Sequence, residues 1–119
     1  MRRVRLVNLT RNTVLAERAA VAETPATRRR GLLGAPSLPD GQGLVIIPCR
    51  HIHTIGMKYS IDVAFVDASW TVRRVVHNLK PGRLSPLVLK GRVVLELPAG
   101  KMEETGTEKG DMLDALPAD

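Results

Sequence analysis

The chain has 119 residues, of which 44% are hydrophobic and 25% charged, and its formal net charge at pH 7 is +6. This length predicts one domain over residues 1–119, with the composition of an ordinary globular protein. Its apolar runs, such as residues 43–47, are far too short to span a bilayer, so no membrane partner is expected. Arg2, Arg3 and Arg5 are not followed by the apolar stretch of a signal peptide. Together with the single cysteine, these features predict a basic cytoplasmic protein.

The first part of the chain predicts a hairpin followed by a helix. Residues 3–6 alternate arginine with aliphatic side chains, which is typical of a half-buried strand, and residues 13–21 predict its partner across a turn. Thr24 and Pro25 are typical of a helix start, because threonine accepts hydrogen bonds from unpaired backbone N–H groups and proline has none to leave unpaired. We expect this helix to end near Leu33.

The rest of the chain predicts short strands separated by turns. Apolar and β-branched residues predict strands at residues 44–47, 61–66, 71–76 and 92–98. Residues 67–70 would connect the second and third of these as a hairpin, and the fourth has the pattern of a central strand. Residues 101–105 predict a short helical turn, a last strand starts at residue 112, and residues 115–119 are expected to fray. Many short strands and one convincing helix predict a mainly-β barrel or sandwich.

Several motifs in this order resemble the bacterial and archaeal family called domain of unknown function 192. The motifs are Thr24-Pro25, Arg30-Gly-Leu-Leu-Gly34, Gly43-Leu44, Cys49-Arg50-x-Ile52-His53-Thr54-x-Gly56-Met57, Ile61-Asp62-Val63-x-Phe65-x-Asp67, Leu95-Glu96-Leu97-Pro98-Ala99-Gly100 and Gly110-Asp111. They cover almost the whole chain. The resemblance implies a small jelly-roll-like β domain with one helix, and it implies no established activity. His51 stands where similar sequences often have a small residue.

A metal site is one interpretation of Cys49, His51 and His53. On an extended strand these three side chains would point to one face, and thiolate and imidazole groups are ligands of zinc and iron. By analogy of fold, a His-x-His pair in a jelly roll would also suit a metal-dependent, cupin-like enzyme. A fourth ligand would have to come from another part of the chain. The alternative is that Cys49 is a small buried side chain, His53 makes a structural hydrogen bond and His51 lies in solvent.

A polar pocket is the second interpretation, and it involves His53, Met57, Asp62 and Glu96. Asp62 and Glu96 lie within apolar strands, and a carboxylate there needs a partner such as His53, an arginine or the backbone N–H groups of the bend at Met57. Asp62 could pin a loop instead, which is the usual role of a buried polar group. If both acids and His53 line one cavity, they would form a site for a small ligand. Met57 would either fill the core or contact that ligand.

The sequence therefore predicts a non-catalytic binding or accessory domain whose ligand is an unidentified small molecule or partner protein. The metal-dependent enzyme is one alternative. Electrostatic binding of nucleic acid is the other, because the arginines are numerous, but only three aromatic residues are available for stacking on bases and no nucleic-acid-binding motif is present. No phosphate-binding glycine loop occurs, so no nucleotide cofactor is expected.

Overall fold

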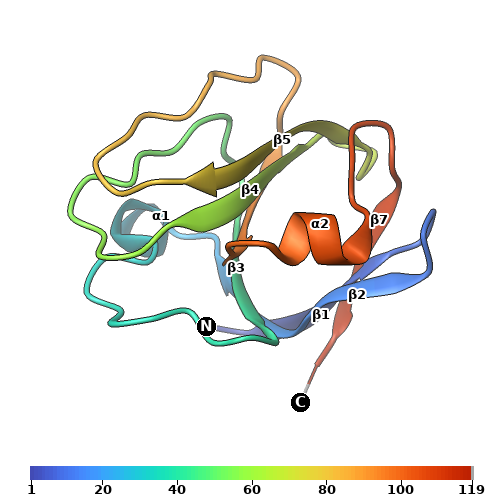
Figure 1. Ribbon diagram of the computed structural model, residues 1–119, viewed down its shortest axis with the longest axis horizontal. Helices are drawn as coiled ribbons and strands as arrows, with labels where there is room; N and C mark the ends of the chain where they lie inside the picture. The colour runs from blue at the N-terminus through green and yellow to red at the C-terminus, as the bar shows by residue number, and fades with distance from the viewer. Residues whose placement is uncertain (119) are drawn as a thin grey trace.

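The computed structural model describes residues 1–118, which form seven β-strands and two short helices (Figure 1). The elements are β1 (Arg3–Asn8), β2 (Thr13–Ala22), α1 (Pro25–Arg30), β3 (Gln42–Ile46), β4 (Ile61–Val66), β5 (Val72–Leu79), β6 (Val93–Pro98), α2 (Lys101–Thr105) and β7 (Leu113–Pro117). The prediction of a mainly-β fold is confirmed. The prediction of a single helix is wrong, since the short turn expected at residues 101–105 is a helix as well.

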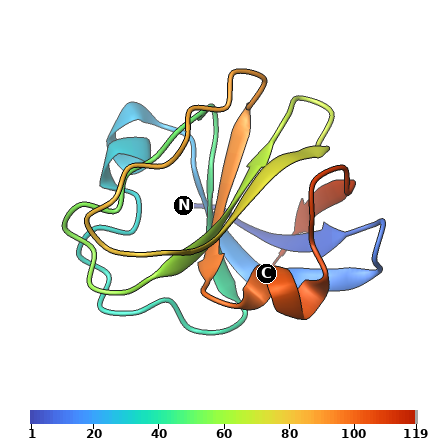
Figure 2. The ribbon, with the colours of Figure 1, turned by 45° about the horizontal axis from the view of Figure 1, so that its top comes forward.

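All seven strands belong to one sheet, in the order β5-β4-β6-β3-β2-β1-β7. The pairs β1–β2 and β4–β5 are antiparallel, which confirms both predicted hairpins, and β6 is a central strand as predicted. Only the β2–β3 pair is parallel, and α1 lies in the crossover between these two strands. A jelly roll or a two-sheet sandwich is not confirmed, because a single sheet curls into a half-barrel instead (Figure 2).

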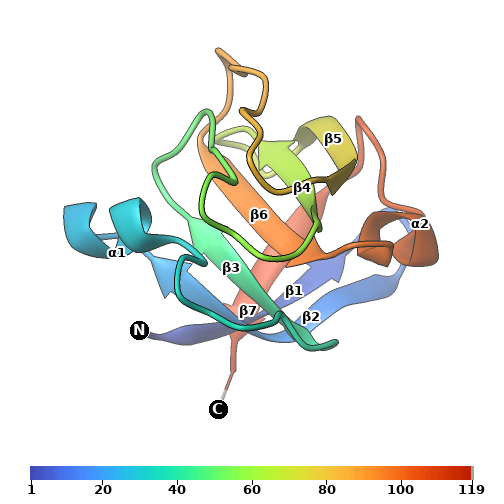
Figure 3. The ribbon, with the colours of Figure 1, turned by 60° about the vertical axis from the view of Figure 1, so that its left-hand side comes forward.

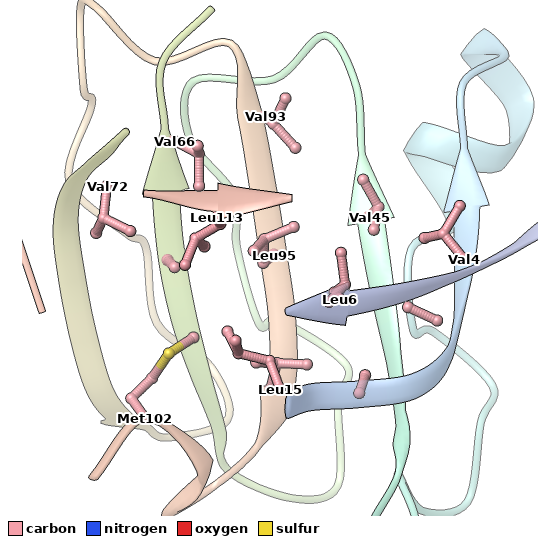
Figure 4. Packing of buried hydrophobic residues seen from close by; sticks show 14 of the residues in the cluster. Val4, Leu6, Leu15, Val45, Val66, Val72, Val93, Leu95, Met102 and Leu113 are labelled. Carbon is pink, nitrogen blue, oxygen red and sulfur yellow. The ribbon is translucent and has the colours of Figure 1, made fainter. Parts of the chain in front are cut away.

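The two ends of the curled sheet approach each other at one edge. The backbone N–H of Val72 donates to Asp111 O at 2.8 Å, and that of Leu113 donates to Trp70 O at 2.9 Å. These bonds join the start of β5 to the start of β7, although the two strands are at opposite ends of the strand order. The curl therefore encloses a core on its concave face, where Leu6, Leu15 and Leu95 pack together (Figure 4).

Buried side chains cover both faces of the central strands. All six residues of β4 and the first five residues of β6 are buried. On the concave face, Met102 of α2 packs into the core with Leu95 and Leu97. On the opposite face, Val63, Phe65 and Val94 form a second cluster together with side chains from the segments that follow α1 and β3. Figure 3 shows α1 and α2 on opposite sides of the sheet.

The boundaries of two elements differ from the sequence prediction. The capping box of Thr24 and Thr27 confirms the predicted helix start, but α1 ends at Arg30 rather than near Leu33, because Gly31 leaves the helix with a φ of 53°. The tail expected to fray from residue 115 is ordered through Pro117, because β7 pairs with β1. Residue 119 lies outside the described part. Neither helix of the described chain has the length and apolar character needed to cross a membrane.

Candidate functional site: a pocket over Glu96

A pocket of about 750 Å³ opens on the convex face of the sheet, between α1 and the segment that follows β3. Apolar side chains form part of its wall, and they come from Leu32, Leu33, Ile46, Ile52, Met57 and Leu87. Basic side chains form another part of the lining, and they are Arg28, Arg29, Arg30, Arg50, His51 and His53. The volume is in the range of small-molecule sites, which are commonly apolar clefts with few polar groups.

Among residues 1–118, Glu96 is the only acidic residue that lines this pocket. It lies on β6 opposite Leu44 of β3 and Val63 of β4, so the neighbouring strands cover its backbone on both sides. The residue is 3% exposed, and its Oε1 has no hydrogen-bond partner in the described chain. Burial raises the pKa of Glu96 to about 7, because loss of water disfavours the charged form. Near neutral pH this carboxyl can therefore either donate or accept a hydrogen bond.

Two other buried polar atoms without partners lie near Glu96. Arg28 lines the pocket, and its Nε is unpartnered while its Nη1 donates to Pro48 O at 3.3 Å. The Tyr59 Oη is the other atom; burial and the nearby charge of Glu96 raise the pKa of Tyr59. Within residues 1–118, these atoms and Glu96 Oε1 are the complete set of buried side-chain nitrogen and oxygen atoms that lack a partner. Since buried polar groups are normally paired, such a grouping needs an explanation.

The predicted metal ligands do not converge. The Cys49 thiol donates to the His51 carbonyl oxygen at 3.1 Å, and burial raises the pKa of the thiol. His51 and His53 are exposed, and His53 Nδ1 accepts the backbone N–H of Ile55 at 3.2 Å. In the chain up to residue 118, His, Cys, Asp and Glu form no group of three or more that could hold a metal ion. The local hydrogen bonds instead match the structural alternative for His53.

Asp62 is buried on the opposite face of the sheet, with α2. Its Oδ1 accepts the backbone N–H of Asn78 at 2.8 Å, and its Oδ2 accepts those of Gly100 and Met102 at 3.0 and 2.9 Å. The prediction that Asp62 accepts hydrogen bonds from the bend at Met57 is therefore wrong. So is the expectation that Asp62 shares a cavity with His53 and Glu96, because Asp62 is absent from the pocket lining. The pocket does bring together His53, Met57 and Glu96.

The contribution of α1 to the site was not predicted from the sequence. Its arginines were given no role at a site, whereas Arg28 is half-buried and lines the pocket. The feature of the sequence that could have indicated this contribution is the Leu32-Leu33 pair after the helix. Leu33 approaches the bend so closely that a Cβ on Gly56 would lie 3.1 Å from its Cδ2. Anchoring this turn holds the preceding arginines over the pocket.

The fold and the pocket define a small β-rich domain with a ligand-sized cavity on the convex face of its curled sheet. The model of domain of unknown function 192, described as "Uncharacterized ACR", matches residues 7–115, so the chain belongs to this family. A UPF0127 protein of Thermococcus sibiricus is 35% identical over 118 residues, which cover 92% of this chain and 73% of that protein.

Two crystal structures share the fold. A protein of unknown function from Novosphingobium aromaticivorans aligns with a TM-score of 0.80 and 21% identity over 94% of this chain and 83% of that chain. A protein of Sinorhizobium meliloti, described as a "putative transcription regulator", aligns with a TM-score of 0.78 and 22% identity over 96% of this chain and 92% of that chain. At these identities the likeness concerns the fold alone.

Proposed function

We propose that the protein is a non-catalytic binding domain for a small organic molecule, which occupies the pocket over Glu96. The observation that carries this proposal is that Glu96 Oε1 and Arg28 Nε, two buried polar atoms without hydrogen-bond partners in the described chain, belong to residues that line the same cavity. Each costs free energy as long as it makes no hydrogen bond. A ligand with polar atoms in the pocket would remove that cost.

The lining of the pocket indicates the chemistry of the ligand. Leu33, Ile52 and Met57 would contact an apolar body, as aliphatic and thioether side chains do in many ligand sites. A polar end would reach Glu96, which accepts or donates a hydrogen bond according to its protonation. Because Arg28 and three other arginines line the pocket, an anionic substituent such as a carboxylate is favoured there.

A binding role agrees better with this site than catalysis does. The Cys49 thiol has a raised pKa and donates to a carbonyl oxygen, so it lacks the thiolate character of a nucleophile. His53 Nδ1 accepts a local backbone N–H, and within the described residues His53 belongs to no group of three or more side chains that could hold a metal ion. A cytoplasmic location remains part of the proposal, because an unpaired cysteine is compatible with a reducing compartment.

The proposal is tested by titrating the protein with a panel of aliphatic and aromatic carboxylates, followed by backbone amide NMR. We expect saturable binding for members of the panel, with shifts concentrated at residues 28–33, 49–57 and 96. Glu96→Gln and Arg28→Gln should each weaken binding. Glu103→Gln, on the exposed surface of α2, is the matched control and should leave it unchanged.

Two results would contradict the proposal. One is the absence of saturable binding by every carboxylate tested. The other is binding that Glu96→Gln and Arg28→Gln leave as strong as in the unmodified protein, because the ligand would then lie elsewhere.

A further inference from the structure

Charge is distributed unevenly between the two ends of the molecule. Three segments, residues 25–36, 47–60 and 80–92, form what we call the basic end. They hold nine of the 18 lysines and arginines and none of the 12 acidic residues. The nine are Arg28, Arg29, Arg30, Arg50, Lys58, Lys80, Arg83, Lys90 and Arg92. The rest of the chain, with nine basic and 12 acidic residues, is therefore acidic overall.

The three segments of the basic end lie side by side. The N–H of Thr54 donates to Arg83 O at 2.8 Å, and the N–H of Val88 donates to Arg50 O at 3.0 Å, so the second and third segments pair along their backbones. Arg28 links the first segment to the second through its bond to Pro48 O. Figures 1 and 2 show these segments gathered at the end of the molecule that lies away from α2.

The basic end also exposes large apolar side chains. Leu84 is 75% exposed, Leu89 73%, Leu87 60% and Ile55 55%. All three leucines fall within residues 80–92, a segment with four basic residues and no acidic one. Exposed leucines that cluster on one surface commonly mark an interaction site. Here the same surface would attract an anionic partner.

We propose that the basic end docks on the surface of an anionic phospholipid bilayer. Leu84 and Leu89 enter the interfacial layer, while the surrounding lysines and arginines contact the headgroups. This proposal does not depend on a ligand in the pocket. The proposal departs from the expectation that the protein has no membrane partner. That expectation rested on the lack of a segment long enough to span a bilayer, whereas this contact needs only exposed loops.

The same surface fits a bilayer better than it fits nucleic acid. Proteins that bind single strands stack bases on aromatic side chains, and the only aromatic residue in the three segments is the half-buried Tyr59. Binding to the phosphates of a duplex would use the basic residues but give no role to four exposed aliphatic side chains. A bilayer interface uses both features.

The test is flotation of the full chain with vesicles of phosphatidylcholine alone or of phosphatidylcholine mixed with phosphatidylserine. We expect binding to the mixed vesicles only, and a decrease as salt is raised because screening weakens it. The pair Leu84→Ser with Leu89→Ser should lower binding about tenfold or more, because burial of leucine side chains is lost. The pair Arg83→Glu with Lys90→Glu should lower it at least as much.

The controls alter the same residue types outside the basic end. The exposed pair Leu9→Ser with Leu116→Ser, and the exposed pair Arg3→Glu with Lys109→Glu, should change binding less than the corresponding pairs in the basic end. No binding to mixed vesicles at low salt would overturn the proposal. So would binding that the leucine pair at Leu84 and Leu89 leaves unchanged, particularly if duplex DNA binds more tightly than the vesicles.

Discussion

Asp62 and Glu96 are buried carboxyl groups on neighbouring strands, but they lie on opposite faces of the sheet and differ in their hydrogen bonds. Asp62 on β4 is 1% exposed and accepts three backbone N–H groups, whereas Glu96 on β6 is 3% exposed and its Oε1 accepts none. The register pairs Asp62 with Leu97 and Glu96 with Val63, so the two side chains emerge on opposite faces. Asp62 therefore stabilises the fold through its hydrogen bonds, whereas Glu96 Oε1 is left available for a hydrogen bond to a ligand.

The largest effect is expected from Asp62→Asn. The amide keeps one oxygen but loses the charge and the second acceptor, so at least one of the N–H groups of Asn78, Gly100 and Met102 loses its bond. We expect the free energy of unfolding to fall by about 4 kcal/mol, because hydrogen bonds to a buried charge are strong and buried donors are costly when unpaired. Urea denaturation monitored by circular dichroism measures this change.

Asp114→Asn is the control for this change. The Asp114 carboxylate is half-buried and accepts the backbone N–H of the adjacent Ala115. Its replacement should cost less than about 1 kcal/mol. If Asp62→Asn costs no more than Asp114→Asn, Asp62 does not have the structural role assigned to it.

Above neutral pH, Glu96→Gln should raise the free energy of unfolding, whereas Asp62→Asn should lower it. In the folded protein the pKa of Glu96 is about 7, above its ordinary value of 4.5, so the folded state binds this proton more tightly than the unfolded chain does. The contribution to stability is full below pH 4.5 and is lost as the pH rises through 7. We therefore expect the variant to become more stable than the unmodified protein by on the order of 3 kcal/mol as the pH rises from 4 to 8.

The measurement is the free energy of unfolding of both proteins across that pH range. Glu103→Gln serves as control because its carboxyl is exposed, and it should follow the unmodified protein within about 0.5 kcal/mol. A constant difference between Glu96→Gln and the unmodified protein from pH 4 to 8 would show that Glu96 is charged at no unusual cost. The contrast with Asp62 would then fail.

Gly43→Ala tests how tightly the concave face is packed. A Cβ on Gly43 would lie 2.6 Å from Leu97 Cδ2 and 3.1 Å from Glu96 O, so either the core or the backbone must move. We expect a loss of about 2 kcal/mol, which is typical of an overpacked core. Leu33→Ala, in the wall of the open pocket, should cost about 1 kcal/mol, because its side chain is only partly buried. Thermal unfolding compares the two, and a larger cost for Leu33→Ala would reverse the expected contrast.

The sequence predicted the strands, both hairpins and the start of α1, because these depend on local periodicity and on a capping residue. It did not predict which carboxyl would be satisfied. Alternation along each strand predicts which neighbours share a face with Asp62 and which share a face with Glu96. Only the register between β4 and β6 shows that the two carboxyl groups lie on opposite faces of the sheet. The donors to Asp62 come from residues 16 to 40 positions away, and no local pattern identifies them. The proximity of Arg28 to Glu96 likewise depends on the folded crossover.

The smallest expected effect concerns α1, which covers the Glu96 face. Thr24→Ala removes the acceptor for the Thr27 N–H and should cost about 1 kcal/mol. Because α1 contributes no fully buried residue, this loss should loosen the helix locally rather than the whole fold. Hydrogen exchange should therefore accelerate at the amides of Arg28 and Gly31, which donate within α1, and stay unchanged at Met102, which donates to Asp62. Equal acceleration at all three amides would mean that the two faces of the sheet unfold together, and that the pocket has no independent mobility.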